Sequence, residues 1–182
     1  MGEVRTERAT TTVVTLGVTG SGKSSVAVGL ADVLGWPFAE GDDFHSSANV
    51  AKMRSGRPLD DEDRWPWLRA LAGWVGEQEA AGRDAVLTCS ALKRSYRDLL
   101  RRGHRSVWFL HVDVPPDELE RRLRTRTDHF MPPSLLRSQL DALEPLQPDE
   151  PGATISGNAP PAAVVSRAVA ALTAGQRAAP ST

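Results

Sequence analysis

Residues 13–25 read VVTLGVTGSGKSS, and the part from Gly17 to Ser24 matches G-x-x-x-x-G-K-S/T, the phosphate-binding P-loop. An apolar, β-branched run precedes this loop, and apolar residues at helical spacing follow it from Val26 to Leu34. Glycines let such a loop bend until bare backbone N–H groups and a helix N-terminus face a polyphosphate. The sequence therefore predicts a nucleoside triphosphate site at a strand–loop–helix junction.

The lysine and the hydroxyl residue that end the motif have separate tasks. Lys23 is placed for the β- and γ-phosphates, and the Ser24 hydroxyl for a Mg²⁺ ion. The predicted nucleotide-binding residues of the loop are Gly17, Val18, Thr19, Gly20, Ser21, Gly22, Lys23, Ser24 and Ser25.

Composition limits the class of protein and its partners. The chain has 182 residues, a length typical of one domain with a full core. Lys and Arg number 22 against 23 Asp and Glu, a net charge of −1 that predicts no nucleic-acid partner. The single cysteine, Cys89, excludes an internal disulfide and favours a reducing, cytoplasmic compartment. No apolar run approaches the roughly 20 residues that cross a bilayer, so we expect no membrane segment.

Predicted strands alternate with predicted helices along the chain. The expected strands cover residues 12–16, 37–39, 84–88, 106–112 and 153–156. The expected helices cover residues 23–34, 46–55, 96–102, 116–124, 134–143 and 161–174. One more helix is expected to begin at 59–64 and to bury a face of Trp, Leu and Val side chains. Such alternation predicts an α/β fold with a five-stranded parallel sheet flanked by helices in three layers.

Among P-loop proteins, the sequence favours a small-molecule kinase. GTPases and motor ATPases are disfavoured, because the chain has no Asn-Lys-x-Asp run and no long strand ending in a metal-binding Asp; FLHVD at 109–113 comes nearest. A small kinase needs an acceptor pocket and a lid that excludes water. We expect one domain over residues 12–175, with the acceptor region at about 42–82 and the lid at about 124–133. Residues 1–11 and 176–182 are expected to be disordered tails.

Several further runs resemble the gluconate kinase (gluconokinase) family. They are GDDFH at 41–45, NVAKM at 49–53, GRPLDDEDRWPWL at 56–68, CSALKRSYRD at 89–98, HFMP at 129–132 and LRSQ at 136–139. The resemblance covers about residues 14–144. It implies a nucleoside-monophosphate-kinase-like fold, transfer of phosphate from ATP to D-gluconate at its 6-hydroxyl, and a homodimer.

An acceptor hydroxyl must be oriented in line with the γ-phosphate, and a carboxylate can take its proton. Asp42, expected at the end of a strand facing the P-loop, is our candidate for that base. The competing interpretation is a turn residue or a helix N-cap, a role that suits Asp43 better.

Gluconate offers a carboxylate and a row of hydroxyls. A guanidinium suits the carboxylate, and Arg64 is the candidate; its alternative is a solvated charge paired with Asp60 or Asp61. His45 is a candidate partner for sugar hydroxyls, although a lone histidine is as often a packing residue. Ser90, after the third strand, is a further candidate for substrate binding.

A basic segment follows the fourth strand and suggests the lid. Arg126 is the first candidate to neutralise the transferring phosphate or stack on adenine, and Arg122 the second; the alternative is a helix C-terminus that favours cations. His129 and Gln139 are candidates for acceptor contacts. The turn at 157–160 lies where related kinases bind adenine, but it is also an ordinary strand–helix turn.

Two other hypotheses remain open at this point. One is a kinase of the same architecture for another polyol acid, such as shikimate. The other is a non-catalytic nucleotide-dependent switch, which would not need Asp42, Arg64 or Arg126. Cys89 is expected to be a small buried residue, since phosphoryl transfer requires no thiol.

Overall fold

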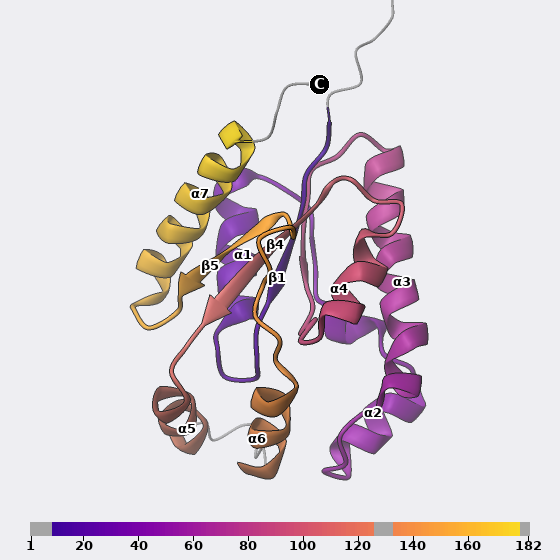
Figure 1. Ribbon diagram of the computed structural model, residues 1–182, viewed down its shortest axis with the longest axis vertical. Helices are drawn as coiled ribbons and strands as arrows, with labels where there is room; N and C mark the ends of the chain where they lie inside the picture. The colour runs from indigo at the N-terminus through magenta and orange to yellow at the C-terminus, as the bar shows by residue number, and fades with distance from the viewer. Residues whose placement is uncertain (1–8, 126–132, 179–182) are drawn as a thin grey trace, which may run out of the picture.

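Five parallel strands form one sheet in the order β2-β3-β1-β4-β5 (Figure 1). The structure is a computed structural model that describes residues 9–125 and 133–178. The predicted α/β architecture is confirmed. The strand that precedes the P-loop is the central one, so the loop leaves the middle of the sheet at its carboxyl edge. The strands are β1 (Thr12–Leu16), β2 (Phe38–Ala39), β3 (Ala85–Thr88), β4 (Val107–Asp113) and β5 (Gly152–Ser156).

Helices cover both faces of this sheet and extend beyond its carboxyl edge. Figure 1 shows α1 and α7 against one face, α3 and α4 against the other, and α5 and α6 past the ends of the strands. The helical segments are α1 (Lys23–Leu34), η1 (Gly41–Phe44, a 3-10 turn), α2 (Ser47–Arg54), α3 (Asp61–Ala80), α4 (Arg94–Arg101), α5 (Pro116–Thr125), α6 (Pro133–Ala142) and α7 (Pro161–Ala178). Among the described residues, no helix is both long and apolar enough to span a membrane.

The three layers follow from the alternation of side chains along each buried strand. In β1, Val13 packs into the core beneath α1 and α7, whereas its neighbour Val14 packs into the core beneath α3 and α4. Phe109 and Leu110 of β4 divide between the same two cores. Because both faces are covered, all five residues of β1 are buried.

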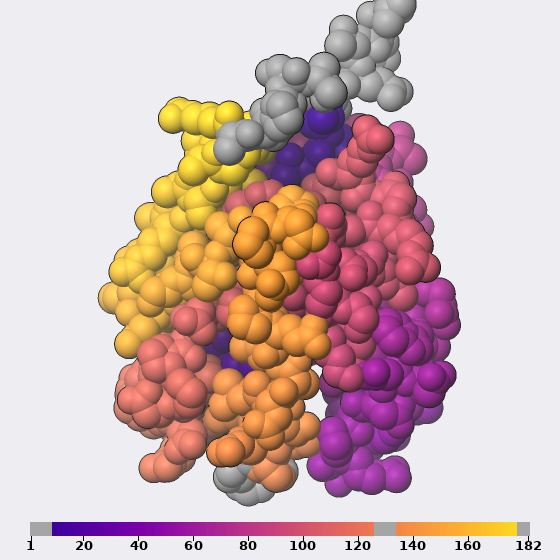
Figure 2. All heavy atoms as spheres, in the orientation of Figure 1, coloured from indigo at the N-terminus to yellow at the C-terminus, as the bar shows by residue number. Residues whose placement is uncertain are grey.

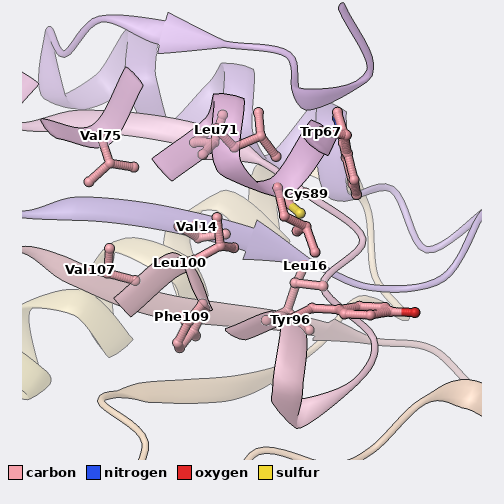
Figure 3. Close-up of a cluster of buried hydrophobic side chains, with 13 residues drawn as sticks. Val14, Leu16, Trp67, Leu71, Val75, Cys89, Tyr96, Leu100, Val107 and Phe109 are labelled. Carbon is pink, nitrogen blue, oxygen red and sulfur yellow. The ribbon is translucent and has the colours of Figure 1, made fainter. Parts of the chain in front are cut away.

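The core on the α3 side reaches the carboxyl edge of the sheet. Figure 3 shows Trp67, Leu71 and Val75 along α3 facing the strands, with Tyr96 at the margin of the cluster. The Tyr96 hydroxyl is directed away from the other apolar side chains, and it donates to Asp61 over 2.5 Å. At this end of the core, polar groups therefore face the loops at the carboxyl edge of the sheet.

Local sequence signals set several of the boundaries. Asp60 caps α3 in a capping box with Asp63, and Gly35 ends α1 in the left-handed conformation with φ +67°. Two predicted boundaries are wrong. The helix expected from residue 134 already begins at Pro133, a position that proline suits. The last helix continues past residue 174 to Ala178, which removes the start of the expected tail; Gly175 packs against the Trp108 indole instead of ending the helix.

Glycine substitutions test this packing, because the same change has opposite effects at two positions. A Cβ at Gly152 would lie 2.4 Å from the Phe109 carbonyl oxygen between β4 and β5, whereas a Cβ at Gly73, exposed on α3, has nothing within 4 Å. We expect Gly152→Ala to lower the free energy of unfolding by about 1–3 kcal/mol. Gly73→Ala should raise it by roughly 0.5–1 kcal/mol. Urea unfolding followed by circular dichroism measures both; equal stability of the two variants would contradict the strand packing.

Candidate active site

The P-loop has the backbone conformation that its glycines predict. Gly20 and Gly22 have φ of +79° and +87°, and α1 begins directly after them at Lys23. At Gly17 a side chain is excluded by space as well, since a Cβ would lie 2.7 Å from Ser21 Oγ and 3.0 Å from the Val112 carbonyl oxygen. The loop therefore turns tightly from β1 into α1 and presents a helix N-terminus to a polyphosphate.

A cavity of about 490 Å³ lies on one side of the P-loop, between α5 and the turn at 157–160. Arg122 links these parts: its guanidinium donates to the Gly157 carbonyl over 2.9 Å and to the Gly20 and Ser21 carbonyls over 3.4 Å. Its Nε donates to Glu118 over 2.8 Å, and the hydrogen bonds from Arg121 and Arg122 lower the pKa of Glu118 to about 2. The predicted residue Arg122 thus borders this cavity.

A second cavity, of about 640 Å³, lies on the other side of the P-loop between α6 and the α2–α3 region. Figure 2 shows the surface opening between the orange atoms of α6 and the purple atoms of α2. It brings together residues predicted from distant parts of the chain: Lys23, Asp42, His45, Arg64, Ser90 and Gln139.

Asp42 is positioned by the residue before it. The Gly41 N–H donates to Thr88 Oγ1 over 2.8 Å, and the Gly41 carbonyl accepts from the Trp67 indole over 2.7 Å. A Cβ on Gly41 would lie 2.0 Å from the Thr88 carbonyl oxygen, so only glycine fits here. The Asp42 side chain is 74% exposed and borders the cavity.

Of the competing interpretation of this acidic pair, the turn is confirmed and the helix cap is wrong. Asp43 lies inside η1, and α2 is capped by Ser46, whose hydroxyl accepts from the Asn49 N–H over 3.2 Å. Neither Asp42 nor Asp43 caps a helix.

His45 is held by packing and by a hydrogen-bond chain. Its ring stacks on Trp67 with centroids 4.2 Å apart. The Asn49 amide donates to the Asp63 carbonyl over 2.8 Å, which places its NH₂ group 3.5 Å from His45 Nδ1. The other ring nitrogen, Nε2, lies 3.9 Å from Asp42 Oδ1. Burial lowers the pKa of His45, against the opposing effect of Asp42, so the ring is neutral at pH 7.

Arg64 does not pair with Asp60 or Asp61, so that alternative is wrong. Its Nε donates to the Leu59 carbonyl over 3.3 Å, and its guanidinium lies 5.7 Å from the centre of the Tyr96 ring. Over residues 9–125 and 133–178, no carboxylate lies within ion-pair distance of Arg64. The cavity therefore contains a guanidinium whose charge is available to an anionic ligand.

Three carboxylates at the start of α3 are paired with lysines instead. Lys93 binds Asp61 over 2.8 Å, and the hydrogen bonds from Lys93 and Tyr96 lower the pKa of Asp61. Lys52 binds Asp63 and also Asp60, the latter over 3.1 Å. Sequence analysis did not assign Asp61 or Tyr96 to the site. Tyr96 lies in the family-like run at 89–98, which could have indicated it. Its hydrogen bond to Asp61 could not be predicted, because the two residues are 35 positions apart in the chain.

Two elements bring the far wall of the cavity to the P-loop. Gln139 of α6 accepts a hydrogen bond from the Thr19 N–H over 2.7 Å, so α6 rests directly on the loop. Ser90 borders the cavity after β3. Two predicted residues, Arg126 and His129, lie outside the described residues.

Comparisons with known proteins agree with this geometry. The sequence family described as an AAA domain matches residues 13–146. A gluconokinase of Gluconobacter oxydans (strain 621H) is 52% identical over 153 residues, which cover 84% of this chain and 86% of that protein. The chain belongs to the gluconokinase family.

Solved structures of two related proteins have the same fold. A sugar kinase from Janibacter sp. HTCC2649 superposes with a TM-score of 0.85 at 52% identity, covering 90% of this chain and 95% of that one. A gluconokinase from Sinorhizobium meliloti 1021 superposes with a TM-score of 0.82 at 42% identity, covering 92% and 94%. The predicted P-loop kinase fold and the predicted family are both confirmed.

Cys89 lies beneath the site of this gluconokinase-family protein and takes no part in it. Its side chain belongs to the α3-side core, and burial raises the pKa of the thiol to about 12. The expectation of a small buried residue is confirmed.

Thiol labelling tests this burial. With a pKa of about 12, on the order of one thiol in 10⁴ is ionised at pH 8, so the folded protein should react with an aromatic disulfide reagent far more slowly than in urea. One thiol per chain should appear on unfolding, since the chain has 1 cysteine. Rapid labelling of the native protein would contradict the burial of Cys89.

Proposed function

We propose that the protein is a gluconokinase that transfers the γ-phosphoryl group of ATP to the 6-hydroxyl of D-gluconate, feeding sugar-acid catabolism and the pentose phosphate pathway. The carrying observation is the acceptor-side cavity, where Lys23 of the P-loop and Asp42 meet Arg64, which has no carboxylate partner among the described residues. Family membership supports the same activity, because the relatives named above include gluconokinases.

The nucleotide occupies the P-loop and the cavity beside α5. Backbone N–H groups of the loop and the N-terminus of α1 hold the phosphates, and Lys23 withdraws charge from the bond that breaks. The adenine fits beside the turn at 157–160, which Arg122 ties to the loop. Arg126 remains our candidate for a charge that closes over the transferring phosphate.

The acceptor occupies the cavity between α6 and α2. Arg64 binds the gluconate carboxylate, while His45, Ser90 and Gln139 contact its hydroxyls. His129 remains a candidate for the same role. The 6-hydroxyl gives its proton to the Asp42 carboxylate as its oxygen bonds to the γ-phosphorus and the bond to the ADP oxygen breaks.

Mg²⁺ is part of the proposal, and the donors in the loop fit it. Over the described ranges, no group of three or more His, Cys, Asp or Glu side chains is placed to hold a metal ion. Magnesium at such sites takes one or two side chains together with substrate phosphates and water, so the Ser24 hydroxyl suffices from the protein. Bound there, Mg²⁺ neutralises charge on the β- and γ-phosphates.

The compartment and the oligomeric state are also part of the proposal. A cytoplasmic location is proposed from the single cysteine, which suits a reducing compartment. A homodimer is proposed from the family resemblance. Sedimentation of the full chain measures its mass.

An acceptor panel tests the reaction itself. ADP release with Mg·ATP should depend on D-gluconate and stay at background with shikimate, D-glucitol or no acceptor. D-glucitol has the hydroxyls of gluconate but no carboxylate, so it isolates the contribution of Arg64. Equal turnover on shikimate would favour the related polyol-acid kinase, and ADP release without acceptor dependence would favour the nucleotide switch.

Asp42→Asn tests the base. Turnover on D-gluconate should fall by roughly 10²-fold or more, because the amide cannot take the proton. Affinity for ATP should stay within about twofold, since Asp42 does not border the nucleotide cavity. Asp43→Asn, at the exposed neighbouring position, is the matched control and should keep wild-type turnover. Unchanged turnover in Asp42→Asn would remove this residue as the base.

A further inference from the structure

A buried ion pair lies behind the acceptor cavity. Arg97 of α4 and Glu150, in the loop between α6 and β5, both have side chains that are 0% exposed. Arg97 Nε donates to Glu150 Oε1 over 2.6 Å, and Nη2 donates to Oε2 over 3.0 Å. Burying two charges is costly, and a well-packed apolar pair of the same volume is often as stable. Stability alone therefore does not account for this pair.

The rest of the Arg97 guanidinium holds a strained stretch of backbone. Nη1 donates to the carbonyl groups of Ala91 and Leu92, each over 3.1 Å. Ala91 has a φ of +39° and is the one non-glycine residue with positive φ in the described part of the chain. An alanine resists this conformation because its Cβ crowds the backbone, so outside contacts must maintain it.

This stretch forms one wall of the acceptor cavity. Ser90, Leu92 and Lys93 all border the cavity, on either side of the strained residue. A change in the Ala91 backbone would therefore turn Ser90 and move Lys93 away from Asp61, which it binds over 2.8 Å.

The same guanidinium also reaches the chain that leaves the opposite wall. Nη2 donates to the Pro145 carbonyl over 3.3 Å, and the Glu144 N–H donates to the Leu92 carbonyl over 2.8 Å. Figure 1 shows this chain rising from α6 beside α4 toward β5. Arg97 thus joins the wall after β3 to the end of α6, whose Gln139 borders the cavity from the other side.

We propose that Arg97, neutralised by Glu150, is a positioning residue for the acceptor: it holds the Ala91 and Leu92 carbonyl groups so that both walls keep their shape. The buried carboxylate lets a guanidinium occupy the interior, and the guanidinium's forked donors reach several carbonyls at once. The inference rests on the proposed function, because it takes this cavity as the gluconate site.

The effect should be confined to the acceptor. Over the ranges that the structure describes, neither Arg97, Glu150 nor the stretch from Ser90 to Lys93 borders the cavity assigned to the nucleotide. Loss of positioning should therefore change kinetics toward D-gluconate and leave ATP binding as it is.

The experiment removes both charges together, so that no buried ion is left unpaired. Arg97→Met/Glu150→Leu keeps the apolar volume but not the bonds to the Ala91 and Leu92 carbonyls. Arg94→Met is the matched control: Arg94 binds Asp149 over 2.7 and 2.9 Å and lies 3.8 Å from Glu150 Oε2, so it links the same two segments, without any bond from its side chain to those carbonyls. Thermal unfolding, KM and kcat for D-gluconate, and Kd for ATP are measured on each protein.

The expected result is a loss of about ten- to a hundredfold in kcat/KM for D-gluconate in the double variant, with Kd for ATP within about twofold. Arg94→Met should stay within about twofold of wild type in all constants. A folded double variant with wild-type kcat/KM would overturn the proposal, whatever its melting temperature. If the double variant does not fold, Arg97→Lys decides by the same criterion, because its ammonium keeps the charge beside Glu150 but not the fork. Failure of the wild type to phosphorylate D-gluconate would instead overturn the proposed function.

Discussion

A polyphosphate must be held by bare backbone N–H groups at a helix N-terminus, and this constraint organises the molecule. The P-loop meets it by leaving the central strand β1 and turning, through glycines with positive φ, directly into α1. Because all five strands are parallel, the loops after β2, β3 and β4 arrive at the same edge. The sheet therefore brings the segments that carry Asp42 and Ser90 to the P-loop, and the helices after its strands add Arg64, Gln139 and Arg122.

Charge compensation separates the cations around the acceptor cavity into paired lysines and unpaired guanidiniums. Lys93 and Lys52 face carboxylates of α3, at Asp61 and Asp63, and are neutralised by them. Arg64, one turn along the same helix, contacts a backbone carbonyl and the Tyr96 ring instead. Arg57 borders the same cavity and donates to Ser55 Oγ, so among the described residues neither guanidinium has a carboxylate partner. This excess of positive charge gives a physical basis for selecting a sugar acid over a neutral sugar.

Contacts behind the acceptor cavity hold the loops that form its walls. Gly41 is fixed between the Thr88 hydroxyl and the Trp67 indole, and Ala91 is held in a strained conformation by Arg97. In the first case Trp67 of α3 holds the segment after β2, and in the second Arg97 of α4 holds the segment after β3. Phosphoryl transfer depends on positioning more than on covalent chemistry, so such supports matter as much as the groups that touch the substrate.

The sequence by itself determined the features that depend on neighbouring residues. The P-loop, the bounds of β1, the end of α1 at Gly35 and the order of strands and helices follow from short-range stereochemistry, which a local pattern encodes. The runs that resemble the gluconokinase family also indicated residues around the acceptor cavity. Only the tertiary structure decided which charges pair. Lys93 meets Asp61 across 32 positions of the chain and Arg97 meets Glu150 across 53, so no local pattern separates a paired lysine from an unpaired arginine. Gly175 shows the same limit: locally a helix stop, it lies within α7 because Trp108 of a distant strand packs against it.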